Sequence, residues 1–256
     1  MKIGIVGCKG RVGSLLVQEL LSGKYDGLTL GGGTALPGDI TGKEEFFVTD
    51  SAEELFKKVG GVIDFTTPDA TRKHAWLAAK HKTAYVVGTT GLTSADEKEL
   101  HDAAKETAIL YTANMSVGVN ILLALVEQAA ARLKDNWDIE IFESHHKHKV
   151  DAPSGTALAL GKAAAKGRNV QLDKVSDVAR HGQTGARKPG QIGFSVARGG
   201  DVVGDHTVYF YSEGERIELT HRATNRILFV HGALRAMAWL KDQKPGLYSM
   251  KDALGL

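Results

Sequence analysis

The chain begins with the stretch that decides its fold, 2-KIGIVGCKGRVG-13. Residues 3–6 form a short apolar run that ends at Gly7, so we predict a buried strand there. Gly10 and Gly13 follow, and residues 11–21 carry apolar side chains at helical spacing. A strand that passes through glycines into a helix can bring its backbone close to a pyrophosphate at the helix N-terminus. The stretch predicts a dinucleotide-binding turn, and a plain strand-to-helix turn is the alternative.

The turn departs from the usual G-x-G-x-x-G pattern, because Lys9 replaces the middle glycine. An acidic side chain that holds the ribose hydroxyls is expected at the end of the second strand, which we predict at residues 28–30. Three glycines follow that strand, Asp26 precedes it, and the next acid is Asp39. Since Lys9 and Arg11 also place two cations in the turn, we predict that NADPH is accepted at least as well as NADH.

The rest of the first half alternates short apolar runs with helical patterns. Ser94 and Glu97 stand at the spacing of a capping box, which predicts a helix start. We expect strands at residues 62–65, 84–87 and 108–111, and helices at residues 51–59, 69–81 and 94–107. Strands that alternate with helices of this length are typical of βαβ units and a parallel sheet.

After Asn114 the pattern changes. We expect a long helix at residues 119–134, a strand at 139–143, a helix at 156–166, and strands at 192–198, 207–212 and 216–224. Strands without helices between them predict an antiparallel or mixed sheet. A last helix, at residues 228–240, is expected to return to the first domain, by analogy with two-domain dehydrogenases. The sequence thus predicts an α/β protein with a Rossmann-type dinucleotide-binding domain at 1–116, a second α+β domain built on a mixed sheet at 117–226, and a returning C-terminal helix at 227–256.

Composition excludes several classes of protein. The chain has 256 residues, 43% of them hydrophobic and 24% charged, with a net charge of +2, so nothing in its overall charge favours nucleic acid or a membrane surface. The single cysteine, Cys8, excludes a disulfide framework and fits a reducing compartment. Glycine is in excess, with 30 residues where average usage would give about 18. Because we find no secretory or membrane-spanning stretch, we expect a cytoplasmic protein.

The densest group of titratable residues is 143-ESHHKHKVDAPSGT-156. A metal site, a nucleic-acid patch and a solvated loop are alternatives to catalysis. No nearby cysteine or H-E-x-x-H pattern supports a metal, and no aromatic residues or wider basic field support nucleic acid. The group follows a strand and leads into a helix N-terminus, where an anion can bind. Because imidazoles titrate near neutral pH and an ammonium group can donate a proton, the group favours a small acidic substrate that is protonated during reaction.

These segments together resemble the bacterial dihydrodipicolinate reductases, a family also named 4-hydroxy-tetrahydrodipicolinate reductases. The resemblance rests on residues 7–13, 88-GTTG-91, 113-ANMSVGVN-120 and 143–157, and it extends through 190–194, 199–207 and 221–223. Its most specific part is the block H-H-x-x-K-x-D-A-P-S-G-T that starts at His145.

The resemblance implies hydride transfer from NADH or NADPH to C4 of a small cyclic dicarboxylate, with loss of a hydroxyl as water, in the synthesis of diaminopimelate and lysine. It implies that His145 is the catalytic acid/base and Lys149 a second proton donor, and that His146 and the backbone of Gly155 and Thr156 bind the substrate. The nucleotide would contact Gly7, Cys8, Lys9, Gly10, Arg11, Val12, Gly88, Thr89, Thr90, Thr112, Ala113, Asn114 and Met115. The resemblance further implies a homotetramer formed through the second domain. We expect no metal, nucleic-acid or membrane partner.

Two alternatives stay open. A different nicotinamide-dependent dehydrogenase, acting on a sugar or an amino acid, could share the two-domain plan, and a nucleotide-sensing regulator could share it without turnover. A semialdehyde dehydrogenase is excluded, because it needs a cysteine nucleophile in the second domain and Cys8 lies in the glycine-rich turn.

Overall fold

The computed structural model describes residues 1–133 and 135–256, and the described chain divides into two units. The first unit contains Met1–Val117 and Ile227–Leu256, and the second contains Gly118–Arg226. Each unit has its own sheet and its own hydrophobic core. None of the described helices is long and apolar enough to span a membrane.

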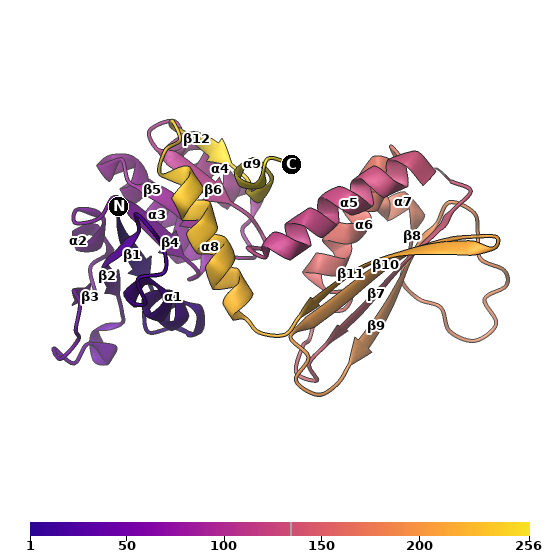
Figure 1. Ribbon diagram of the computed structural model, residues 1–256, viewed down its shortest axis with the longest axis horizontal. Coiled ribbons are helices and arrows are strands. Elements are labelled where there is room, and N and C mark those ends of the chain that lie inside the picture. Colours follow the sequence, from indigo (N-terminus) through magenta and orange to yellow (C-terminus); the bar gives the residue numbers. More distant parts are fainter. Residues whose placement is uncertain (134) are drawn as a thin grey trace. The chain divides into compact units, whose positions relative to one another are not determined.

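The first unit is built on a parallel sheet whose described strands have the order β12-β6-β5-β4-β1-β2-β3 (Figure 1). The strands are β1 (Lys2–Val6), β2 (Thr29–Thr34), β3 (Val48–Thr49), β4 (Gly61–Asp64), β5 (Ala84–Val87), β6 (Ala108–Tyr111) and β12 (Gly246–Tyr248). The chain moves outward from β1 to β3 and then crosses to β4 on the other side of β1. Such a reversal of strand order marks the place where doubly wound sheets bind ligands. The predicted Rossmann-type α/β domain is confirmed.

Helices cover both faces of this sheet. They are α1 (Arg11–Leu21), α2 (Ala52–Phe56), α3 (Pro68–His81), α4 (Ser94–Ala103), α8 (Ile227–Leu240) and α9 (Met250–Leu254), with a short 3₁₀ turn η1 (Pro37–Asp39). One face packs on α1 and α8 around Ile5 and Leu234, and the other packs on α2, α3 and α4 around Tyr85 and Leu100. Alternate strand residues point to opposite faces, and because helices cover both faces the central strands β1, β4, β5 and β6 are mostly apolar.

The three consecutive glycines lie inside β2, whereas the sequence predicted that the strand ends before them. A Cβ on Gly31 would lie 2.7 Å from Val59 Cγ1, and one on Gly33 would lie 2.5 Å from Cys8 Cβ. Gly32 has a φ of +149°, which side chains rarely adopt. The strand therefore continues to Thr34 because glycine alone leaves room for its neighbours.

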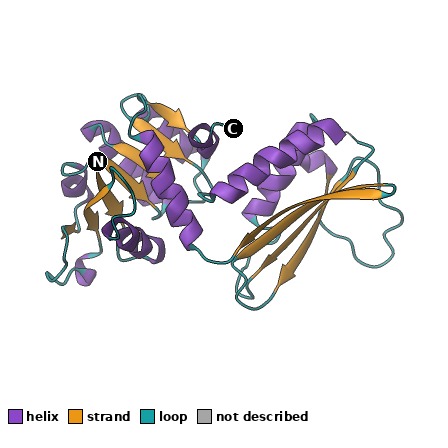
Figure 2. Cartoon of the chain, in the orientation of Figure 1, coloured by secondary structure: helices purple, strands orange, loops and turns teal. Residues whose placement is uncertain are grey.

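The second unit is built on a mixed sheet whose described strands have the order β11-β10-β7-β9-β8. The strands are β7 (Asp138–His145), β8 (Ser176–Asp177), β9 (Ile192–Arg198), β10 (Gly204–Ser212) and β11 (Glu215–Ala223), and the helices are α5 (Val117–Leu133), α6 (Gly155–Gly167) and α7 (Leu172–Val175). Strand β7 runs parallel to β9 and antiparallel to β10, so the predicted mixed sheet is confirmed. Figure 2 shows α5 and α6 on one face of this sheet. Lys134, the last residue of the predicted long helix, lies outside the described residues.

Strand β7 carries both the core and polar side chains on one face. Ile139, Ile141, Glu143 and His145 are all buried at alternate positions of the strand. The two isoleucines belong to the core that α5 and α6 cover. Because side chains alternate along a strand, the same periodicity that builds this core brings Glu143 and His145 to the sheet's end.

Candidate active site

The histidine cluster divides into one buried residue and a loop. His145 is the last residue of β7 and is 8% exposed, whereas Lys147 and His148 are exposed in the loop that follows. That loop is tied to the segment before β10, since the His146 N–H donates to the Val202 carbonyl at 2.8 Å. Within residues 1–133 and 135–256, no group of three His, Cys, Asp or Glu side chains is arranged to hold a metal.

A buried carboxylate, Glu143, orients His145. Glu143 Oε2 lies 2.5 Å from His145 Nδ1. Arg198 donates twice to the same carboxylate, at 2.8 Å to Oε2 and 2.9 Å to Oε1, and the Ser154 N–H donates to Oε1 at 2.9 Å. Burial raises the pKa of Glu143, but the hydrogen bonds from Arg198, His145 and Ser154 outweigh burial and lower its pKa overall. Because the ionised Glu143 can only accept, Nδ1 of His145 carries a proton and Nε2 is left to exchange one.

Nε2 of His145 faces Gly204, the first residue of β10. A Cβ at position 204 would lie 2.9 Å from this nitrogen, so glycine leaves space beside it. His206 packs edge-on against His145, with ring centroids 5.0 Å apart, and its Nε2 lies 3.1 Å from Ser154 Oγ. The register of the sheet explains this grouping, because it places His206 opposite Glu143 and Arg198 opposite His145.

His206 is neutral at physiological pH. Burial, reinforced by the nearby charge of His145, lowers the pKa of His206 to about 4. The residue is 4% exposed, so water does little to stabilise a charge on its ring. His206 therefore supports Ser154 without adding a second charge beside His145.

Acid should destabilise the protein through His206. A histidine in the unfolded chain has a pKa of about 6.5. Between pH 6.5 and pH 4, His206 therefore binds a proton in the unfolded chain but not in the folded chain. Stability should be full above pH 6.5 and fall by up to about 3 kcal/mol as the pH falls to 4. Urea unfolding at pH 7.5 and 4.5 measures this loss. The variant His206→Gln, whose amide can still bond Ser154, should lose less; equal acid sensitivity in both proteins would contradict the assignment.

The N-terminus of α6 lies next to this network. Ser154 caps the helix, because its Oγ accepts the Ala157 N–H at 3.1 Å. Gly155 and Thr156, which the family resemblance implies hold a substrate carboxylate, are the first two helical residues. N–H groups of a first helical turn point out of the helix end, and the helix dipole adds a partial positive charge. Ser154 joins the two features, since it also bonds Glu143.

Lys149, the second predicted proton donor, has a different partner. Its Nζ pairs with Asp151 Oδ1 at 2.7 Å. His146 stays in the same loop, where burial, followed by the positive charge of Arg226, lowers its pKa. The structure thus connects His145 to Gly155 and Thr156 through Glu143 and Ser154, whereas Lys149 bonds Asp151.

The three segments predicted to hold a nucleotide follow strands of the parallel sheet. Residues 7–12 follow β1, residues 88–90 follow β5, and residues 112–115 follow β6. Since the carboxyl ends of parallel strands meet at one edge, the three segments share that edge. Gly7 has a φ of +69°, and a Cβ on Gly13 would lie 2.1 Å from the Gly7 carbonyl oxygen. The glycines therefore leave backbone without side chains at the N-terminus of α1, and a pyrophosphate fits there.

The side chains of these segments differ in what they can contact. Lys9 and Arg11 are exposed, whereas Met115 is 2% exposed. Cys8 is also buried, and burial raises the pKa of its thiol, so its sulfur is not exposed in the turn. The Thr89 hydroxyl is buried and bonds the Thr71 hydroxyl at 2.8 Å.

Models of one protein family match nearly the whole chain. Residues 1–115 match "Dihydrodipicolinate reductase, N-terminus", and residues 118–254 match "Dihydrodipicolinate reductase, C-terminus". The chain belongs to the dihydrodipicolinate reductase family. The resemblance predicted from the sequence motifs is confirmed.

Individual members of the dihydrodipicolinate reductase family match this chain along almost their full lengths. The 4-hydroxy-tetrahydrodipicolinate reductase of Zymomonas mobilis is 49% identical over 256 residues, covering 100% of this chain and 98% of that protein. The protein of the same name from Sulfurovum sp. is 49% identical over 258 residues, covering 100% and 99%. The solved structure of dipicolinate-bound dihydrodipicolinate reductase from Paenisporosarcina sp. TG-14 has a TM-score of 0.81 at 23% identity and covers 98% of both chains. This likeness shows the shared fold.

A buried acid that the sequence analysis did not single out, Asp64, supports one of the segments predicted to hold a nucleotide in this member of the dihydrodipicolinate reductase family. It ends β4 and is fully buried. Its Oδ2 accepts from the Tyr85 hydroxyl at 2.5 Å and lies 2.7 Å from His74 Nδ1, and its Oδ1 accepts from the Thr89 hydroxyl at 3.3 Å. Burial raises the pKa of Asp64, but its bonds to His74 and the hydroxyl groups lower it overall. Asp64 thus holds the segment that contains Thr89.

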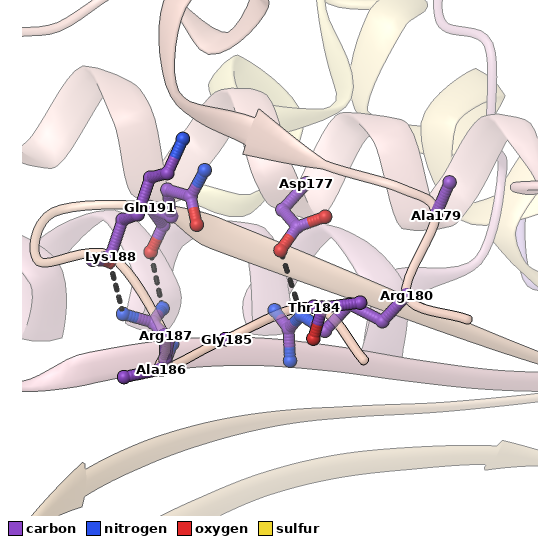
Figure 3. A pocket seen from close by; sticks show the side chains of 9 residues that line it. All are labelled: Asp177, Ala179, Arg180, Thr184, Gly185, Ala186, Arg187, Lys188 and Gln191. Atoms are coloured by element: carbon purple, nitrogen blue, oxygen red, sulfur yellow. Dashed lines mark hydrogen bonds and ion pairs between the residues drawn. The ribbon is translucent and has the colours of Figure 1, made fainter. Parts of the chain in front are cut away.

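The second unit also has a polar hollow of about 380 Å³, lined by Asp177, Ala179, Arg180, Thr184, Gly185, Ala186, Arg187, Lys188 and Gln191 (Figure 3). Arg180 donates to Asp177 at 2.7 Å, and Arg180 and Arg187 each donate to Glu140 at 2.8 Å. Acidic side chains therefore already compensate the charges of both arginines in this hollow.

Proposed function

We propose that this protein reduces 4-hydroxy-tetrahydrodipicolinate to tetrahydrodipicolinate and water, with NADH or NADPH as the hydride donor, in the synthesis of lysine through diaminopimelate. The relatives are named for this reduction, and one structural observation supports the proposal most directly. Glu143 and Ser154 join a buried histidine to a helix N-terminus, so a proton donor and a carboxylate-binding site lie in one network.

The residues of this network have distinct roles in the proposed reaction. The nicotinamide of the dinucleotide would supply the hydride for C4 when the glycine-rich turn of the first unit holds the pyrophosphate. His145 donates a proton from Nε2, because Glu143 holds its Nδ1–H and Gly204 leaves Nε2 accessible. The overall reaction consumes one hydride and one proton, and the hydroxyl leaves as water. Gly155 and Thr156 hold a substrate carboxylate, while the neutral His206 keeps Ser154 in place.

Further predicted contacts complete the proposal. Lys149 is the second proton donor, which requires that it release Asp151, and His146 contacts the substrate. Residues 1–116 bind the dinucleotide, residues 117–226 bind the substrate and form the oligomer, and the segment 227–256 completes the first domain. The single cysteine fits a reducing compartment, so we propose a cytoplasmic enzyme.

A direct assay tests the proposed function. Freshly prepared condensation product of pyruvate and aspartate semialdehyde is mixed with the purified protein and either NADPH or NADH, and loss of nicotinamide absorbance is followed. We expect oxidation that depends on the substrate, with a KM for NADPH no higher than that for NADH. Nucleotide binding without turnover would favour a regulator, and turnover of a sugar or amino acid instead would favour another dehydrogenase. A strong preference for NADH would contradict the cofactor prediction alone.

We also propose that the chain forms a homotetramer through the sheet face opposite α5 and α6. Phe142 is 39% exposed on β7, and on β10 the rings of Tyr209 and Tyr211 stack with centroids 5.5 Å apart. Aromatic side chains are enriched at protein interfaces. Light scattering of the purified protein should give the mass of four chains, and Phe142→Glu should lower it; a monomeric wild-type protein would contradict the proposal.

A further inference from the structure

The proposed nucleotide site lacks an acid where NAD-binding sheets usually carry one. Strand β2 ends at Thr34, which Ala35 and Leu36 follow. Thr34 is nonetheless fixed to the phosphate turn, because its carbonyl accepts the Cys8 N–H at 2.8 Å and its Oγ1 accepts the Gly7 N–H at 3.1 Å. The end of the second strand therefore has its usual place, where the adenosine ribose binds. An acid that reads the ribose must come from another segment.

The loop after β2 brings such an acid to the turn. Glu44 Oε1 accepts from Lys9 Nζ at 3.2 Å. The same oxygen accepts from the Thr41 N–H and the Thr41 hydroxyl, both at 3.0 Å. The side chain of Glu44 is 7% exposed and that of Lys9 is 41% exposed. Glu44 is thus fixed by its own loop and paired with a cation that is open to solvent.

The charge of Glu44 is permanent and acts on the turn. Its bond from the Thr41 N–H, helped by Lys9, lowers the pKa of Glu44 to about 2. Both charges also affect the thiol of Cys8: burial raises the pKa of Cys8 most, Lys9 lowers it, and Glu44 raises it. Glu44 therefore contacts Lys9 directly and acts on the charge of the neighbouring Cys8 as well. These three donors bond Oε1 and the N–H of Glu44 itself also bonds the carboxylate, which can accept about four hydrogen bonds and so has room for one more.

Resting on the proposed function, we propose that Glu44 reads the adenosine ribose and that its pair with Lys9 sets the balance between NADH and NADPH. A free ribose hydroxyl donates to Glu44 while Lys9 stays paired. A 2′-phosphate brings negative charge next to Glu44, and Lys9 must turn from the carboxylate to the phosphate. The pair admits both nucleotides, because Lys9 favours the phosphorylated one and Glu44 opposes it.

The test compares Glu44→Gln with Glu45→Gln. Glutamine keeps an oxygen for Thr41 but removes the charge, and Glu45 is exposed, so its variant changes the net charge equally. Isothermal titration of the full-length protein gives dissociation constants for ADP and 2′,5′-ADP, and for NAD⁺ and NADP⁺. We expect Glu44→Gln to favour the 2′-phosphorylated ligand of each pair by about tenfold relative to wild type. Glu45→Gln should change the ratio less than about twofold.

Lys9→Met provides an independent measurement. It should weaken the 2′-phosphorylated ligands by about tenfold and affect the others little. Equal weakening of both ligands by Glu44→Gln would show that Glu44 only holds its loop, and equal ratios for the Glu44 and Glu45 variants would show a general field effect; either result overturns the proposal. A wild-type protein that binds neither nucleotide would instead overturn the proposed function.

Discussion

The variant His145→Gln is expected to turn over its substrate about 10²–10⁴ times more slowly than the wild-type protein. Glutamine can still bond Glu143 but cannot exchange a proton in the neutral range, so the fold should survive while acid–base catalysis is lost. The affinity for NADPH should not change, because the nucleotide turn belongs to the other unit. Steady-state kinetics and titration with NADPH measure the two quantities.

A matched control for this variant lies three residues further along the chain. His148 is exposed in the loop after β7, and His148→Gln makes the same chemical change away from Glu143. Its kcat should stay within about threefold of the wild-type value. If His145→Gln turned over substrate as fast as His148→Gln, another residue would have to be the acid.

A second large effect is expected for Glu143→Gln. The carboxylate accepts from Arg198, His145 and Ser154 at once, and a glutamine amide has only one oxygen to accept these bonds. The NH₂ group of the glutamine must then face either another hydrogen-bond donor or an unprotonated Nδ1 of His145. The second arrangement changes the tautomer of His145. We expect kcat to fall by about 10²-fold or more, and the free energy of unfolding to fall by about 1–3 kcal/mol. Kinetics and urea unfolding measure both effects.

Glu140→Gln separates the loss of orientation from the loss of a charge. Glu140 lies on the same strand but on the opposite face, where it pairs with Arg180 and Arg187. Both variants therefore break arginine pairs, yet only Glu143→Gln touches His145. Full turnover in Glu143→Gln would show that Glu143 stabilises the second unit without directing the histidine.

The parts of the fold that depend on periodicity could be predicted from the sequence. The alternation of strands and helices fixed the class of the first unit, and strands without helices between them indicated the mixed sheet. The exact ends of the elements could not be predicted in the same way. The predicted capping box of Ser94 and Glu97 was wrong by one residue, because Thr93 and Asp96 form it. Both pairs have the same spacing, so the sequence alone could not choose between them.

The residues around His145 show which parts of a site a sequence can indicate. Glu143 could have been found, since two residues along a strand place side chains on the same face. Arg198 and His206 could not, because the register between β7 and its neighbours brings them there. Glu44 could not be found either, since an irregular loop carries it to Lys9.

The glycines of β2 have a practical consequence for studying the nucleotide turn. Gly33 lets the strand close over Cys8, which is 2% exposed and is the chain's single cysteine. A thiol reagent can reach that sulfur only when the surrounding structure opens, and the chain has no second thiol that it could modify. In the unaltered protein, the rate at which a thiol reagent labels Cys8 therefore measures how often this one region opens.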